Sequence, residues 1–189
     1  MTYLNRKQAL KKMAVTASLL ALHKISKADT ESPDRKECKM HNHDTKVIDW
    51  KGAALIVVDM QNDFVRSGAP LEVTSALGTV PAQRTLIEAF HKHHLPVVYT
   101  KFISHPHYYL LWEWSPQCQP PTKCCWKGHQ RFYKDIGASR DCTDVIDELR
   151  PASADIIIEK FGYGAFHETT LDKTLRSLGV SSLVITGTV

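Results

Sequence analysis

From residue 53 onward the chain alternates between short apolar runs and longer segments that carry one apolar stripe. The short runs are rich in Val and Ile without polar alternation, which is typical of strands buried on both faces of a parallel sheet. They fall at residues 53–58, 96–100, 155–160 and 183–186. Strands that alternate with helices in this way predict an α/β sandwich with a largely parallel sheet.

Three helices are predicted between these strands. The first begins with Thr79 as its cap and Pro81 in its first turn, and the second begins near Asp141. A capping-box pattern at residues 169–172 opens the third, and Gly179 ends it. The predicted inward residues are Leu86, Ile87 and Phe90, then Val145, Ile146 and Leu149, then Leu171, Leu175 and Leu178.

Two oppositely charged residues stand at strand ends. Asp59 follows the first apolar run and Lys160 ends the third. In parallel sheets ligands bind beyond the carboxyl ends of the strands, so this pair is a candidate site. Two solvated strand-end charges are the alternative interpretation.

Size and charge fit one globular domain. The chain has 189 residues, of which 43% are hydrophobic, and a formal net charge of +4. Six basic residues and no acidic ones lie within residues 1–28, which leaves 18 basic and 20 acidic residues elsewhere. The body therefore has no basic surface for nucleic acid, and no apolar run is long enough to span a membrane.

Residues 1–28 predict a bacterial export signal. A basic stretch precedes an apolar run, and Ser26 and Ala28 suit a cleavage site. Arg6-Lys7 resembles a twin-arginine pair, so we expect export to the periplasm. An amphipathic helix packed on the domain and a mitochondrial presequence are the alternatives. Residues 29–49 are a predicted polar linker, in which Cys38, His41, His43 and Asp44 form either a metal-binding cluster or a solvated tail.

Three segments resemble the isochorismatase-like cysteine hydrolases. Residues 54–64 (ALIVVDMQNDF) are similar to the family's first signature, and residues 160–180 are similar to its second. Residues 183–189 resemble the strand that leads into the third. The resemblance covers residues 50–189 and implies a hydrolase domain with a three-layer α/β/α fold around a parallel sheet.

The resemblance also implies an Asp–Lys–Cys site. Asp59 takes the role of general base, and Lys160 stabilises charge beside the thiol. The resemblance places Phe64, Tyr163 and Phe166 against a small-molecule substrate. The family's nucleophilic Cys and two further strands would follow Val189, so we expect an incomplete domain that is inactive as given. The expected reaction is hydrolysis of a small amide or carbamoyl C–N bond. A vinyl ether hydrolase that needs no Cys and a non-catalytic binding module are the alternatives.

Residues 102–140 form an insertion rich in aromatic residues and cysteines. Its aromatic side chains predict a substrate lid, a local mini-core or a subunit contact, the last compatible with a homo-oligomer. Cys118, Cys124, Cys125 and Cys142 are candidates for disulfides in an exported protein. The stretch at residues 103–107 has two His but lacks the Asp of metal-binding relatives, so neither a metal nor another cofactor is expected.

Overall fold

The computed structural model describes residues 50–107 and 115–188, which all belong to one compact unit, Thr45–Val189. The predicted export signal, the linker and the cluster at Cys38 lie outside the described residues. So do four of the insertion's aromatic residues, at positions 108, 109, 112 and 114. None of the helices in the described part of the chain is long and apolar enough to cross a membrane.

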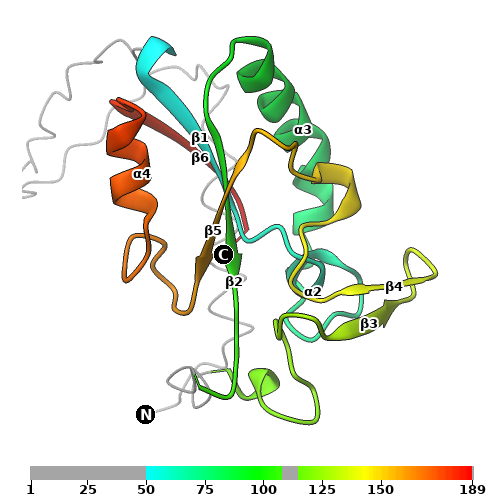
Figure 1. Cartoon of the computed structure of the whole chain (residues 1–189). Helices are drawn as coiled ribbons and strands as arrows, with labels where there is room; N and C mark the ends of the chain where they lie inside the picture. The colour runs from blue at the N-terminus through cyan, green and yellow to red at the C-terminus, as the bar shows by residue number, and fades with distance from the viewer. Residues whose placement is uncertain (1–49, 108–114, 189) are drawn as a thin grey trace, which may run out of the picture. The chain divides into compact units, whose positions relative to one another are not determined.

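Four parallel strands form the central sheet, as the apolar runs predict (Figure 1). They are β1 (Ala53–Val58), β2 (Val97–Phe102), β5 (Ile156–Lys160) and β6 (Ser182–Gly187). Their order is β5-β2-β1-β6, and every neighbouring pair is parallel. The register pairs Val58 with Thr100 and Phe102 with Lys160, so the carboxyl ends of three strands lie together.

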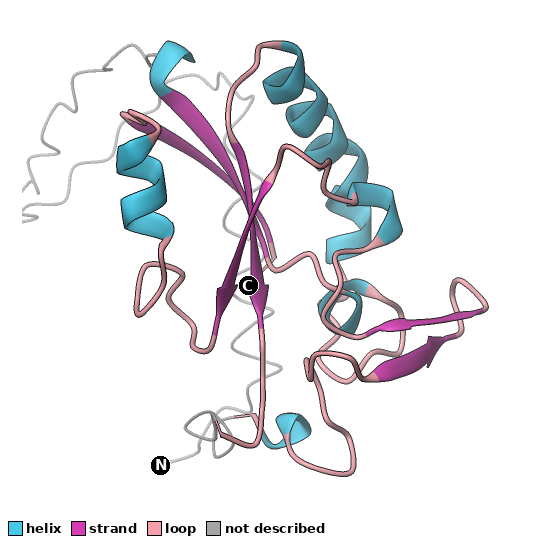
Figure 2. Ribbon diagram, in the orientation of Figure 1, coloured by secondary structure: helices cyan, strands magenta, loops and turns pink. Residues whose placement is uncertain are grey.

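Helices cover both faces of this sheet (Figure 2). The helix α3 (Ala76–Lys92) and the short turn η4 (Asp147–Leu149) pack on one face, and α4 (Leu171–Ser177) packs on the other. Strand β1 is almost wholly buried because it is central and covered on both sides. The two outer strands are less covered, since Ile157 on β5 and Leu183 and Ile185 on β6 remain exposed.

The predicted start of the first helix is wrong by one turn. The helix α3 begins at Ala76, and the Thr79 hydroxyl donates a hydrogen bond to the Ala76 carbonyl instead of capping the helix. Pro81 therefore lies inside the helix. Its apolar stripe is nevertheless placed correctly, because Ile87 and Phe90 are buried against the sheet.

The helix predicted near Asp141 is also wrong. The Asp141 carboxylate accepts bonds from the Thr143 N–H and hydroxyl, which fixes a turn. Val145 then forms an isolated bridge with Gln61, and the Ile146 N–H donates to the Met60 carbonyl. The segment is therefore extended, although its apolar residues are buried as expected and only the turn η4 follows.

The third helix is shorter than predicted. Its capping box does not form, because the Thr169 hydroxyl accepts the Leu171 N–H and the Asp172 carboxylate pairs with Arg176, while Thr170 occupies the N-cap position. The helix ends at Ser177, and Leu178 is 46% exposed instead of continuing the buried stripe of Leu171. Gly179 follows with a φ of 67°, the left-handed conformation that favours glycine after a helix.

The insertion contains its own small elements. These are the turn η3 (Pro116–Cys118) and a hairpin of β3 (Gln130–Tyr133) and β4 (Ala138–Asp141). Two further short elements, η1 (Trp50–Gly52) and α2 (Asn62–Val65), flank β1 in sequence. The hairpin lies beside α2 (Figure 1), where the Tyr133 hydroxyl donates to the Asp63 carboxylate.

Candidate active site

Asp59 and Lys160 meet beyond the ends of β1 and β5. The Lys160 Nζ lies 2.7 Å from the Asp59 Oδ2, and each residue is only 3% exposed. An ion pair this deeply buried is costly unless its remaining polar atoms are bonded. The pair therefore requires further partners, and strand β2, which lies between β1 and β5, supplies one of them.

Thr100 on β2 is that partner. Its hydroxyl donates a 2.6 Å hydrogen bond to the Asp59 Oδ1, and Thr100 is fully buried. The Asp59 backbone N–H in turn donates hydrogen bonds to the Thr100 carbonyl and hydroxyl oxygens. One oxygen of the carboxylate is thus held by a neutral donor and the other by a cation, which fixes the orientation of the group.

Burial raises the pKa of the Asp59 carboxyl above its usual value. The Lys160 ammonium, through its charge and its hydrogen bond, and the Thr100 hydroxyl both act in the opposite direction. Desolvation dominates because water reaches almost none of the side chain. A carboxylate with a raised pKa is a stronger base, and this suits a group that has to take a proton near neutral pH.

Lys160 is held from three sides. Besides Asp59, its ammonium donates to the Tyr163 carbonyl at 3.0 Å and to the Gly162 carbonyl at 3.4 Å. The ring of Phe102 lies 6.0 Å from the nitrogen, at the limit of a cation–π contact. These neutral acceptors bond to the amine and hold it in place beside Asp59.

The backbone around Asp59 is unusual. Asp59 has a φ of 49°, in the left-handed region that non-glycine residues seldom occupy. Next to it, β6 passes so close to β1 that a Cβ on Gly187 would lie 2.2 Å from the Val58 carbonyl oxygen. Only glycine fits at this position, and the following Thr188 N–H bonds to the same carbonyl.

Gln61 ties the neighbouring strand end to the site. Its side-chain amide donates to the Phe102 and Thr143 carbonyls, and its carbonyl accepts the Phe102 N–H at 2.6 Å. The side chain is completely buried, so it continues the hydrogen bonding of β2 where the strand ends. The motif contains this residue, but nothing in the sequence indicates its bonding role.

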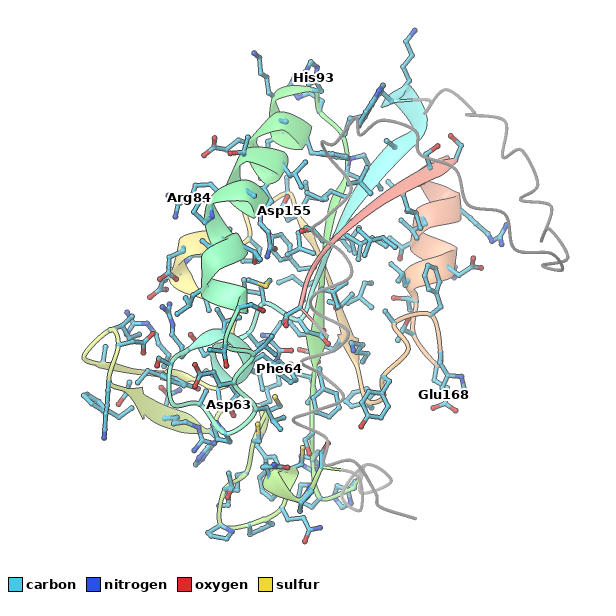
Figure 3. All side chains as sticks on the ribbon, turned by 180° about the vertical axis from the view of Figure 1, so that it is seen from behind. Asp63, Phe64, Arg84, His93, Asp155 and Glu168 are labelled. Atoms are coloured by element: carbon cyan, nitrogen blue, oxygen red, sulfur yellow. The ribbon has the colours of Figure 1, made fainter. Side chains whose placement is uncertain are left out.

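The three predicted substrate contacts occupy different environments. Phe64 is half-buried, with its ring 6.3 Å from that of Phe102, whose ring also faces Lys160. Tyr163 is 62% exposed and Phe166 is 51% exposed, both in the loop between β5 and α4. The backbone carbonyl of Tyr163 contacts the site by accepting a hydrogen bond from Lys160. Glu168 belongs to the same loop as Tyr163 and Phe166, and Figure 3 shows it and Phe64 on separate sides of this end of the sheet.

The disulfides expected from the sequence are not formed. Cys118, Cys124, Cys125 and Cys142 are free and buried. The contact with Cys125 raises the pKa of Cys124 most, and burial and the Asp63 charge both raise the pKa of each of these thiols. A thiol with a raised pKa is a poor nucleophile, so none of the four is a suitable substitute for a nucleophile beside Asp59.

A hollow of about 730 Å³ lies elsewhere. Trp50, Lys51 and the last turn of α3 line it, together with His93 and His94. Figure 3 places His93 at the opposite end of the molecule from Asp63 and Phe64. The volume is open, and it is not joined to the Asp59–Lys160 pair, so it is not the candidate active site.

The fold and the pair define a class: parallel α/β domains with a buried Asp–Lys pair at the strand ends. Comparison with known proteins agrees, because an isochorismatase domain matches residues 53–189. The chain belongs to the isochorismatase family.

Two curated relatives indicate the breadth of the family. Ureidoacrylate amidohydrolase RutB of Acinetobacter baylyi is 31% identical over 153 residues, which cover 71% of this chain and 58% of the relative. Enterobactin synthase component B of Escherichia coli K12 is 27% identical, with 78% of this chain and 48% of the relative covered. The chain thus spans less than two thirds of the length of these relatives.

Solved structures share the fold. N-carbamoylsarcosine amidase from Thermoplasma acidophilum is 33% identical, with a TM-score of 0.57 over 71% of this chain and 66% of that one. A cysteine hydrolase from Pseudomonas syringae pv. phaseolicola is 26% identical, with a TM-score of 0.61 over 73% and 60%. Family and fold are therefore those that the sequence motifs predict.

Proposed function

We propose that this chain is part of a longer protein, and that the longer protein hydrolyses a C–N bond in a small amide or carbamoyl compound. The observation that carries the proposal is the buried pair of Asp59 and Lys160, with Thr100 on the free oxygen of the carboxylate. Two similar proteins named as amidohydrolase and amidase favour amide chemistry over the other reactions of the family.

In the proposed mechanism Asp59 shuttles a proton while a thiol forms the covalent bond. Asp59 takes the thiol proton, and sulfur attacks the carbonyl carbon to give a tetrahedral oxyanion. The C–N bond then breaks as the protonated Asp59 returns its proton to the leaving nitrogen. Water hydrolyses the thioester after Asp59 takes one of its protons, and the thiol is restored. Lys160 remains an ammonium and stabilises the thiolate throughout.

The thiol in this proposal belongs to a residue that follows Val189. Strand β6 leads toward the site through Gly187 and Thr188, and the exposed side chains of Leu183 and Ile185 offer an apolar surface for further chain. The relatives extend beyond the matched region.

Phe64, Tyr163 and Phe166 are the proposed substrate contacts. Phe64 offers a fixed apolar wall because it packs on Phe102, whereas the exposed rings of Tyr163 and Phe166 sit on the loop that holds Lys160. A small planar amide suits such a wall.

Export to a bacterial periplasm remains part of the proposal. Residues 1–28 would be removed there, so the mature protein would begin near Asp29. Mass spectrometry of the protein from its native host would show this new N-terminus, whereas peptides that retain residues 2–20 would contradict export.

The test is turnover of ureido and carbamoyl amides by the longer protein and its variants. Asp59→Asn and Lys160→Met should each lower kcat/KM by at least about a hundredfold. Lys127→Met is the matched control, because Lys127 forms an exposed ion pair with Glu159. Full activity of Asp59→Asn would refute the mechanism. Turnover of a vinyl ether but no amide would favour the ether hydrolase, and ligand binding unchanged by either substitution, without turnover, would favour a binding module.

A further inference from the structure

A cluster of four thiols surrounds a buried carboxylate on the insertion side of the molecule. Cys118, Cys124 and Cys125 belong to the insertion, Cys142 lies just after it, and all four are fully buried. The Cys124 and Cys125 sulfurs are 3.8 Å apart, and together with an Asp63 carboxylate oxygen they all lie within 4.8 Å of one another. Figure 3 shows Asp63 next to Phe64 in this region.

Asp63 is anchored there as a neutralised anion. Its Oδ1 accepts 2.7 Å bonds from the Arg131 Nε and the Tyr133 hydroxyl, and its Oδ2 accepts the Cys125 N–H at 3.0 Å. The positive charge of Arg131 balances the negative charge of the Asp63 carboxylate. Because the neighbouring thiols are neutral, the cluster as a whole carries no net charge. Oδ2 also accepts a longer 3.4 Å bond from the Arg131 Nη2, and the Cys124 and Cys142 thiols bond to the same carboxylate.

The thiols themselves are held in the protonated form. Burial raises the pKa of Cys118 and of Cys125 to about 11, and the contact with Cys125 raises that of Cys124 further. Burial likewise raises the pKa of Cys142, and the Asp63 charge adds to the rise in all four. Such thiols are poor nucleophiles, which argues against a catalytic or exchange role.

Packing alone does not account for this arrangement. Buried cysteines often act as small apolar side chains, and Phe102 does pack against three of them. The thiols of Cys124 and Cys142 also bond to the Asp63 carboxylate, so the cluster is more than an apolar contact. The 3.8 Å separation of the Cys124 and Cys125 sulfurs matches a tetrahedral zinc site, in which bonds of about 2.3 Å place neighbouring sulfurs about 3.8 Å apart.

We propose that Cys124, Cys125 and Asp63 bind one thiophilic divalent cation of the zinc class. Cys142 is not assigned as a ligand, because its thiol donates to the Trp126 carbonyl at 3.1 Å. Binding replaces the thiol protons by the metal, and each coordinating cysteine releases one proton to solvent.

The cation would join distant parts of the chain. Asp63 opens α2 directly after the Asp59 loop and is 62 residues away from Cys125. Closing so long a loop restricts the unfolded chain strongly. The site would therefore fasten the insertion to the base of the active-site wall formed by Phe64 and Phe102.

Cobalt titration of the reduced, metal-free protein tests the proposal without any activity measurement. Co²⁺ should bind at one equivalent, give the near-ultraviolet thiolate-to-cobalt band and be displaced by Zn²⁺. Cys124→Ala and Cys125→Ala should each lose the band, whereas Cys118→Ala and Cys38→Ala should keep it. These controls separate the proposed ligands from a buried thiol that is not assigned as a ligand and from the cluster at residues 38–44.

Unaltered protein provides the second readout, which does not depend on the folding of variants. Zn²⁺ should raise its thermal midpoint and release about two protons per bound ion, as expected for two cysteine ligands. No thiolate band in the wild-type protein would overturn the proposal. So would a band that survives Cys124→Ala, or peptide mapping that finds Cys124 or Cys125 in a disulfide of the native protein.

Discussion

Replacing Thr100 by Val tests how the site controls the proton affinity of Asp59. The two side chains have nearly the same shape, so the substitution removes the hydroxyl donor and leaves the strand intact. Thr100 is fully buried, and its 2.6 Å bond goes to an oxygen that Lys160 does not contact. In Thr100→Val that oxygen would lose its hydrogen-bond donor in a place that water does not reach.

The magnitude follows from the charge on the acceptor. A buried hydrogen bond to an ionised group contributes about 1.5–3 kcal/mol. Since each pKa unit corresponds to about 1.4 kcal/mol, Thr100→Val should raise the Asp59 pKa by about 1–2 units. The change adds to the rise that burial already causes.

The effect on stability has a defined pH dependence. The Asp59 pKa in the folded protein lies above its value in the unfolded chain, so ionised Asp59 opposes folding at neutral pH. Thr100→Val enlarges this penalty. As the pH falls through the raised pKa, the folded protein takes up the proton and the difference between variant and wild type shrinks.

Two assays report the shift. Carbon-detected NMR titration of the Asp carboxyl gives the pKa directly, and the acid limb of kcat/KM in the longer protein should move to higher pH by the same amount. Thr100→Ser is the matched control, since it keeps the hydroxyl and should restore the wild-type values. An unchanged pKa in Thr100→Val, or an equal shift in Thr100→Ser, would refute the reasoning.

Three further substitutions test the surroundings of the site by chemical denaturation. Gly187→Ala should cost about 3 kcal/mol of stability or more, because its Cβ would overlap the Val58 carbonyl; wild-type stability would contradict the close strand approach. Gln61→Leu should cost about 2–4 kcal/mol, since it leaves the backbone groups of Phe102 unpaired, and a loss below 1 kcal/mol would show that water replaces the amide. Arg131→Met should cost about 2–3 kcal/mol by leaving the Asp63 carboxylate buried without its cation. The exposed Arg176→Met serves as its control, and equal losses in the two would contradict the burial argument.

The strands were predictable because each contains a continuous apolar run, which is the sequence pattern of a parallel strand buried on both faces. The same rule anticipated that Asp59 and Lys160 meet, since both follow strands that end at one edge of the sheet. The prediction of a helix near Asp141 is wrong for a physical reason. Its apolar residues must be buried in either conformation, and the Asp141 side chain and the bridge to Gln61 decide in favour of the extended one.

The supporting residues were not predictable from local patterns. Thr100 reads as an ordinary strand residue until the order β5-β2-β1 places it between the two charges. The need for glycine at position 187 arises only from the approach of β6 to Val58. The predicted export suggested disulfides among the cysteines, whereas the carboxylate at the centre of the thiol cluster becomes visible only in three dimensions.

The most direct test of the central claim is mass spectrometry of the longer protein mixed with a small carbamoyl amide and quenched within the first turnover. The proposed mechanism predicts an acyl adduct on one cysteine of the wild-type protein and no adduct in Asp59→Asn. Turnover without any adduct, or an adduct that forms equally fast in Asp59→Asn, would contradict the role assigned to the Asp59–Lys160 pair.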